Sequence, residues 1–212
     1  MSIIRRLCLS VSLLFISSCS TVYYSVWETL GQEKRDLLKS NIEKTTESQN
    51  EVKEEFKDTI SKIRSEYKFD AGHLETTYDA LAEDYSDAKS EAKALSARID
   101  RVESIATDLF AEWQTEIGQI KTKKYRVESR RKLAATKKRF KPMLASMRRV
   151  EASLDPILDK FNDQVLFLKH NLNAAALGSF KAEFRSIEKD IRYLVNNMEK
   201  STKEADQFIS TM

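Results

Sequence analysis

The chain has 212 residues, and its 36 Lys and Arg residues nearly balance its 33 Asp and Glu residues, which leaves a formal net charge of +3. Only four glycines and two prolines are present, too few turn residues for a mixed or all-β fold. Because charged residues make up 33% of the chain, the composition favours long helices and coiled coils.

The N-terminus carries the marks of an export signal. Arg5 and Arg6 form a positive start, and the apolar run Leu7–Ile16 follows them. This run is shorter than the roughly 20 residues that span a bilayer, so we expect no transmembrane helix here. At its end a cysteine follows Ser17 and Ser18, in place of the usual small-residue cleavage site.

The segment Ile16, Ser17, Ser18 and Cys19 resembles the lipobox of bacterial lipoproteins, which reads aliphatic, small, small, cysteine. The resemblance implies cleavage before Cys19, a lipid on its thiol, and acylation of the new amino group with a chain such as palmitate. Two or more acyl chains anchor a protein stably. Ser20, where Asp would favour inner-membrane retention, implies the outer membrane of a Gram-negative bacterium, facing the periplasm. The alternatives are an ordinary cleaved signal that contains a cysteine, or an uncleaved short anchor.

Cleavage would leave about 190 residues, enough for one or two domains. We expect a lipoprotein signal peptide at residues 1–18, the lipidated Cys19 with a tether at 19–25, and a helical coiled-coil domain at 26–212. Because Cys8 leaves with the signal and Cys19 is acylated, the mature chain would have no thiol for a disulfide.

The first expected helix begins near Trp27 and continues to Tyr67, with Thr45 and Gln49 on its apolar stripe. We therefore expect a thin, partly polar seam. Asp and Gly residues after Phe69 favour a turn.

The second expected helix has the clearest heptad pattern. Its apolar residues follow alternating steps of four and three over nearly six heptads, which predicts coiled-coil packing. An extra step of four, from Trp113 to Ile117, is a stutter that locally unwinds a supercoil, and Gly118 lies inside it. The stripe consists of Leu74, Tyr78, Leu81, Tyr85, Ala88, Ala92, Leu95, Ile99, Val102, Ala106, Leu109 and Trp113.

Beyond the stutter, this helix is expected to reach Lys141 and is basic all around. Thirteen basic and two acidic residues lie between Ile117 and Ala152, whereas Glu75–Glu116 contains eleven acidic and four basic residues. The basic block needs an acidic neighbour or solvent. Its expected seam residues are Val127, Leu133, Ala134 and Phe140.

Pro142 is expected to begin a third helix, whose apolar stripe continues to Ile209. Pro156 should kink or break this helix, because proline removes a backbone donor, and Asp155 would cap the restart. Gly178 is a second weak point.

Three helices folded up, down and up predict an all-α, elongated antiparallel three-helix coiled-coil bundle. At 1.5 Å per residue, turns near Ala71 and Lys141 bring five landmark residues into one layer near the tethered end. A basic two-helix hairpin, Lys121 to about Phe161, would protrude roughly 35 Å beyond that layer. The candidate hub layer consists of Trp27, Leu109, Trp113, Phe167 and His170.

The sequence contains no nucleophile elbow, phosphate-binding loop or paired-carboxylate signature, so we expect no enzyme activity. His73 and His170 are the only histidines and are expected far apart, so we expect no metal site and no cofactor besides the lipid on Cys19. The polar segment His170–Asn173 would be either a recognition patch or a set of hydrogen-bonded helix residues.

The basic hairpin is the best candidate contact site. It suits anionic lipid headgroups, or alternatively the acidic block of a second molecule or another protein; it would otherwise be a solvated helix face. Nucleic acid is not an expected partner in the periplasm. The candidate anionic-surface contact residues are Lys121, Lys123, Lys124, Arg126, Arg130, Arg131, Lys132, Lys137, Lys138, Arg139 and Lys141.

Several short segments stand out along the chain, and the most specific is Val165–Ala174. Together they resemble an uncharacterised bacterial lipoprotein family, domain-of-unknown-function family 2959. The resemblance covers the whole mature chain and implies a lipoprotein with an all-helical structure, but it brings no activity. The other segments are Tyr23–Gly31, Lys34–Asp36, Lys68–Asp70, Leu109–Trp113 and Glu204–Ile209.

We therefore expect a non-enzymatic, lipid-anchored helical rod that faces the periplasm and serves as an envelope scaffold or partner-binding adaptor. The alternative is a peripheral protein that binds anionic lipid or handles lipid with its basic hairpin. An apolar groove wide enough for an acyl chain would favour the alternative, and a tightly filled seam would favour the scaffold. Expected partners are the membrane, through the acyl chains, and another protein or a second copy.

Overall fold

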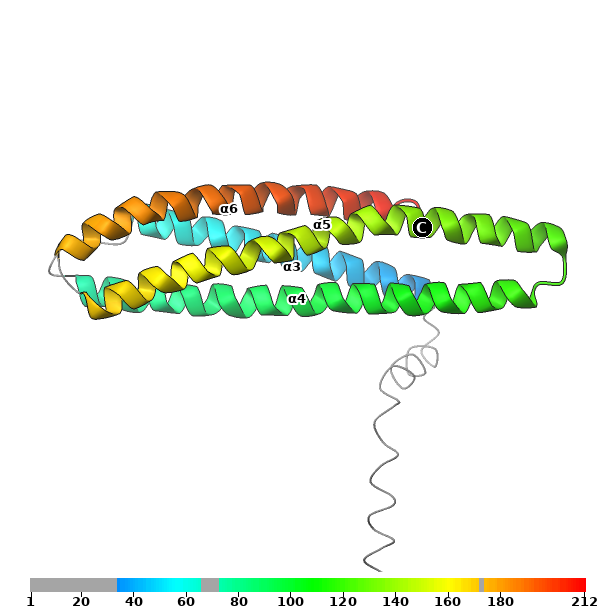
Figure 1. The fold of residues 1–212 in the computed structure, drawn as a ribbon, viewed down its shortest axis with the longest axis horizontal. Coiled ribbons are helices and arrows are strands. Elements are labelled where there is room, and N and C mark those ends of the chain that lie inside the picture. Colours follow the sequence, from blue (N-terminus) through cyan, green and yellow to red (C-terminus); the bar gives the residue numbers. More distant parts are fainter. Residues whose placement is uncertain (1–33, 66–72, 172–173) are drawn as a thin grey trace, which may run out of the picture. The chain divides into compact units, whose positions relative to one another are not determined.

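A computed structural model of the chain describes residues 34–65, 73–171 and 174–212, and these residues are almost entirely helical (Figure 1). Four helices follow one another: α3 (Lys34–Ser65), α4 (Leu74–Gln119), α5 (Lys123–His170) and α6 (Ala174–Ile209). No strand occurs within these ranges, which confirms the all-α fold class.

The chain divides into two compact units, Met1–Leu37 and Leu38–Met212. Of the first unit, the structure describes Lys34–Leu37, the opening turn of α3. The second unit holds the remainder of α3 together with α4, α5 and α6. In this helical bundle α5 packs on both α4 and α6, and α3 contributes Ile63 to the shared core.

Within the second unit, α5 packs antiparallel to α4 and to α6. The rings of Phe110 on α4 and Phe208 on α6 both pack edge-on against Phe140 of α5, with centroids 5.5 and 5.6 Å away. Further along α5, Phe161 packs edge-on against Tyr85 of α4, with centroids 5.9 Å apart. The numbers rise on one helix as they fall on its neighbour, which is the register of antiparallel pairs.

The apolar stripes predicted from the sequence form the core. Leu95, Ile99 and Val102 of α4 are fully buried, as are Met147 and Val150 of α5. One cluster of buried residues draws on all four helices and joins their ends near the α5–α6 turn. Its members are Ile63, Leu81, Phe161, Val165, Leu168, Phe180 and Phe184.

The seam of α3 is partly polar, as predicted. Thr45 is buried and its hydroxyl donates to the Asn41 carbonyl at 2.7 Å, which satisfies it locally. Gln49 is fully buried, and neither atom of its amide has a hydrogen-bond partner among the described residues. An unpaired buried amide costs free energy, so Gln49 lowers the stability that the seam of α3 contributes.

The prediction of one helix from Leu74 to Lys141 is wrong. α4 ends at Gln119 and α5 begins at Lys123, so the chain turns at Ile120–Thr122. Ile120 (φ −68°, ψ 112°) and Thr122 (φ −70°, ψ 113°) both take extended conformations that any L-residue adopts. The turn therefore needs neither Gly nor Pro, and for that reason no turn residue in the sequence marks it.

The prolines do not interrupt α5 either. Pro142 and Pro156 both lie inside this continuous helix, so no helix begins at Pro142 and none breaks at Pro156. Asp155 therefore caps no helix restart, contrary to the prediction. Both prolines are exposed. On the solvent side, water can satisfy the backbone carbonyl that loses its helical donor, which lowers the cost of the proline.

The expected third helix is instead divided at its polar segment. α5 ends at His170, and the Asn171 backbone N–H donates to the Leu168 carbonyl at 3.1 Å. The Asn171 side-chain amide also donates to the Phe167 carbonyl at 3.0 Å. These bonds satisfy carbonyls that a helix end leaves unpaired, so the polar segment ends α5. The described residues therefore form four helices where the sequence suggested three.

Candidate contact surface on the basic hairpin

The helices α4 and α5 continue past the end of α6 (Figure 1). The last residues of α6 meet α5 at Arg139 and Phe140, where Arg139 Nη2 donates to the Thr211 carbonyl at 3.4 Å. α5 begins 16 residues earlier, at Lys123, which places its start about 24 Å beyond that level. Residues 111–138 are here named the basic hairpin, a shorter element than the predicted Lys121–Phe161.

The basic hairpin has a small interior of its own. Trp113 Nε1 donates to the Ser129 hydroxyl at 2.9 Å, and this bond links α4 to α5. Ile117 and Leu133 are buried between the two helices. Arg126 donates to the Ile120 carbonyl at 3.4 Å and so ties the first turn of α5 to the loop before it.

The candidate contact cations are mostly exposed and without ion pairs. Arg126 is half-buried, and the ten others are exposed. Among the described residues, Lys132 is the one member of this set with a carboxylate partner, Glu128, at 3.3 Å. The Lys137 ammonium lies 5.6 Å from the centre of the Phe110 ring, in cation–π range. The hairpin therefore presents a strongly positive surface that its own side chains do not neutralise.

Three pairs of adjacent cations repeat along the outer face of α5: Lys123–Lys124, Arg130–Arg131 and Lys137–Lys138. Successive pairs are seven residues apart, which is two helical turns or about 10.5 Å, so they lie in one row. All six side chains are exposed, and they are here named the dibasic stripe. The period is readable in the sequence, but its outward orientation depends on which face of α5 is buried.

Two apolar side chains at this end of α5 are more exposed than the sequence indicated. Val127 was expected at the seam but is 57% exposed, and Tyr125, which no pattern singled out, is 61% exposed. Ala134, also expected at the seam, is exposed, whereas Leu133 and Phe140 are buried as predicted.

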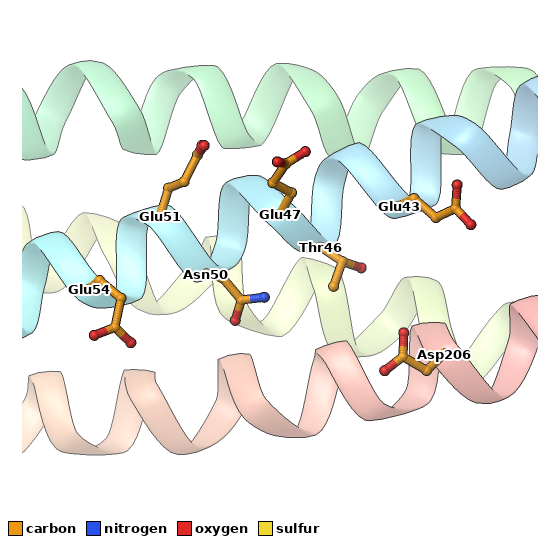
Figure 2. A pocket seen from close by; sticks show the side chains of 7 residues that line it. All are labelled: Glu43, Thr46, Glu47, Asn50, Glu51, Glu54 and Asp206. Atoms are coloured by element: carbon orange, nitrogen blue, oxygen red, sulfur yellow. The ribbon is translucent and has the colours of Figure 1, made fainter.

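An acidic groove that the heptad pattern did not predict lies between α3 and α6. Figure 2 shows the side chains that line it, carboxylates in a row along α3 and one from α6. The groove has a volume of about 680 Å³. The spacing of its carboxylates along α3, in steps of four and three residues, is the sequence feature that could have predicted this groove. The lining residues are Glu43, Thr46, Glu47, Asn50, Glu51, Glu54 and Asp206.

Carboxylates also gather between α3 and α4. Burial raises the pKa of Glu91 on α4, and the charges of Glu55, Glu51 and Asp87 raise it further. Glu91 Oε2 has no hydrogen-bond partner among the described residues. The face of α3 toward α4 therefore adds to the negative charge around the groove.

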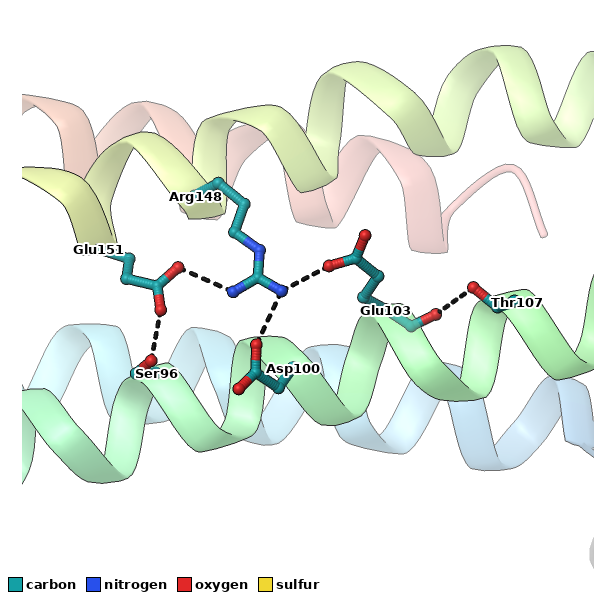
Figure 3. Close-up of polar contacts among 6 residues, drawn as sticks. All are labelled: Ser96, Asp100, Glu103, Thr107, Arg148 and Glu151. Carbon is teal, nitrogen blue, oxygen red and sulfur yellow. Dashed lines mark hydrogen bonds and ion pairs between the residues drawn. The ribbon is translucent and has the colours of Figure 1, made fainter. Parts of the chain in front are cut away.

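Arg148 holds α4 and α5 in register (Figure 3). Its guanidinium pairs with Asp100 of α4 at 2.7 Å, with Glu151 of α5 at 2.8 Å, and with Glu103 of α4. The Ser96 hydroxyl also donates to Glu151. Burial lowers the pKa of Arg148, but the hydrogen bonds to these carboxylates outweigh it and hold the pKa above its ordinary value.

The structure does not bring the candidate hub residues into one layer. Leu109 and Trp113 lie in the last part of α4, near the α4–α5 turn, whereas Phe167 and His170 lie at the opposite end of α5. Both Phe167 and His170 are exposed. The layer depended on a turn near Lys141, and moving that turn to Ile120–Thr122 separates its members.

The remaining candidate residues, Cys19, the lipobox residues Ile16, Ser17 and Ser18, and Trp27, lie outside the described residues. In the described ranges, no group of three or more His, Cys, Asp or Glu side chains is arranged to hold a metal ion. None of the helices described is long and apolar enough to cross a membrane.

A family model described as "Protein of unknown function (DUF2959)" matches residues 23–212. No curated protein and no solved structure matches the chain.

Proposed function

Because the chain belongs to the DUF2959 family, we propose a function from its geometry: a non-enzymatic, lipid-anchored scaffold or partner-binding adaptor of the bacterial envelope. The observation that supports this proposal is the basic hairpin, which extends beyond α6 and carries cations without ion pairs. Cations that only keep a protein soluble need no such clustering. A contact with an anionic partner would explain why these cations are clustered on the hairpin.

The filled core also favours the scaffold. Many stripe residues of α4 and α5, such as Leu95, Ile99 and Met147, are buried to the last few per cent of their surface, as in a tightly packed seam. The groove on α3 and α6 is lined by carboxylates and polar groups, which suit cations and not an acyl chain.

The location is part of the proposal. The lipobox-like segment ending at Cys19 would place acyl chains at the N-terminus, and Ser20 after it favours the outer membrane, facing the periplasm. The Cys19→Ser variant should leave the membrane fraction and lose lipid labelling. If this variant still fractionates with membranes and keeps its signal cleavage, the anchor is not the lipid on Cys19.

Site-specific photo-crosslinking in cells tests the contact function. A photoreactive amino acid at Arg131, on the basic hairpin, should give a discrete adduct with an envelope component. The matched control is Arg185 on α6, which is likewise exposed and without an ion pair among the described residues. Equal labelling from both positions, or none from Arg131, would contradict a contact role for the hairpin.

A second candidate function is peripheral binding of anionic lipid, and the exposed Tyr125 and Val127 favour it. Apolar side chains beside cations suit the headgroup region, where each Lys or Arg contributes about 1 kcal/mol. Binding to anionic vesicles at low salt should weaken by a few kcal/mol when Lys123, Lys124, Arg130 and Arg131 are neutralised together. Equal binding to neutral and anionic vesicles excludes this candidate.

A further inference from the structure

The dibasic stripe and the acidic groove have opposite charge and comparable length. The stripe extends from Lys123 to Lys138, about 22 Å along α5, and the groove carboxylates extend from Glu43 to Glu54, about 16 Å along α3. Both are rows on one face of a helix, so one row can lie along the other.

The groove has charges and a polar group left for an incoming partner. Glu47, Glu51 and Asp206 have no ion-pair partner among the described residues, whereas Glu43 pairs with Lys39 at 4.0 Å and Glu54 pairs with Lys57 at 2.9 Å and Lys53 at 3.7 Å. The Thr46 hydroxyl is covered and has no hydrogen-bond partner in the same part of the chain.

The stripe cannot occupy the groove of its own molecule. α5 is one continuous helix from Lys123 to His170, and its early turns lead away from the level where Arg139 meets the end of α6. Asp206 lies on α6 itself, beside the α3 carboxylates (Figure 2), whereas α4 and α5 continue past the end of α6 (Figure 1). A stripe that fills this groove must therefore belong to another molecule.

We propose that the dibasic stripe of one molecule docks in the acidic groove of a second copy of the chain. The contact joins two different surfaces, so each molecule keeps one free stripe or one free groove, and the contact repeats into open chains or closes into rings. This inference rests on the scaffold function and gives it an assembly rule. The alternative, in which the stripe binds a lipid surface, is distinguished from self-association by the test below.

The test uses charge reversal in the purified full chain, held in a non-ionic detergent. Sedimentation velocity should show concentration-dependent association at about 50 mM salt and its loss at about 500 mM, because salt screens exposed charges. The stripe variant Arg130→Glu/Arg131→Glu/Lys137→Glu and the groove variant Glu47→Lys/Glu51→Lys/Glu54→Lys should each associate about tenfold more weakly alone.

Mixing the two variants is the decisive arm. Each then offers a surface of the opposite sign to the other, so association should return to near the wild-type level. A wild-type chain that stays monomeric at low salt overturns the proposal, as does a mixture that does not reassemble. A monomer whose stripe variant loses binding to anionic vesicles assigns the stripe to lipid.

Crosslinking provides a readout that does not depend on the folding of any variant. Carbodiimide coupling of mixed isotope-labelled wild-type chains should join Lys123 or Lys124 of one copy to Glu47 or Glu51 of another. Intermolecular links that are absent, or that avoid the groove, contradict the docking. The fractionation of Cys19→Ser does not involve the stripe, and an Arg131 adduct with another envelope component would still support the proposed function. Failure of the docking is therefore distinguishable from failure of the envelope function.

Discussion

At the scale of single residues, the Arg148 network shows how one cation fixes a helix pair. Its guanidinium bridges Asp100 and Glu103 on α4 to Glu151 on α5, and the side chain is 33% exposed. Multiple charge-assisted hydrogen bonds at a partly covered site contribute more than an isolated surface pair. Two helices with a uniform apolar seam can pack in several registers of similar stability, so such a bridge favours one register.

Arg148→Ala should therefore lower the free energy of unfolding by about 1–2 kcal/mol, measured by chemical denaturation. Arg149→Ala is the matched control, since Arg149 is exposed and forms no ion pair among the described residues. Equal effects of the two substitutions would mean that the network contributes nothing to the fold.

Glu91 predicts a pH dependence. Its folded-state pKa is raised above the ordinary 4.5 by burial and by Glu55, Glu51 and Asp87. A raised pKa contributes stability that is present below the unfolded value and lost as pH rises through the folded value. Glu91→Gln should therefore be more stable than wild type at neutral pH, with the gap narrowing as pH falls toward 4.5.

Thermal melts across that pH range measure the difference between wild type and variant. Glu83→Gln, at an exposed position of the same helix, is the control and should follow the wild type. A gap that widens on acidification would contradict the burial of Glu91 among carboxylates.

At the scale of elements, heptad spacing predicted the cores of α4 and α5 because periodicity reports which face is buried. It did not predict the turn at Ile120–Thr122, because extended residues of ordinary type make that turn without a sequence signal. Pro142 and Pro156, by contrast, predicted helix ends that the structure does not have. Both prolines are exposed, on a side of α5 where water can replace the missing backbone donor. The sequence alone does not show which side of α5 its neighbouring helices leave open to solvent.

Pro156→Ala should raise the free energy of unfolding by about 1–3 kcal/mol, because alanine restores the backbone donor inside a continuous helix. Pro142→Ala should change stability with the same sign. Chemical denaturation gives both values. If both substitutions are neutral or destabilising, the chain turns at these prolines and α5 is not continuous.

At the scale of the whole second unit, one displaced turn decides which distant residues meet. Moving it from near Lys141 to Ile120–Thr122 separates Trp113 from His170 and shortens the basic hairpin. The charge blocks were readable in the sequence, but the acidic groove was not. The acidic groove needs Asp206 of α6 beside α3, and only the packing of the helices provides that neighbour.

The basic block folds back against the end of α4 as a two-helix hairpin. Pulsed electron paramagnetic resonance between spin labels at the exposed positions Ala111 and Lys132 tests it directly. Labels at Ser90 and Ala111, both exposed on α4, are the control and should give about 32 Å, the rise of 21 helical residues.

Neighbouring helices lie about 8–10 Å apart, so the Ala111–Lys132 pair should give a short distance, about 10–20 Å with the label arms included. A distance of about 32 Å for this pair, equal to the control, would show one continuous helix through Ile120–Thr122 and would contradict the hairpin.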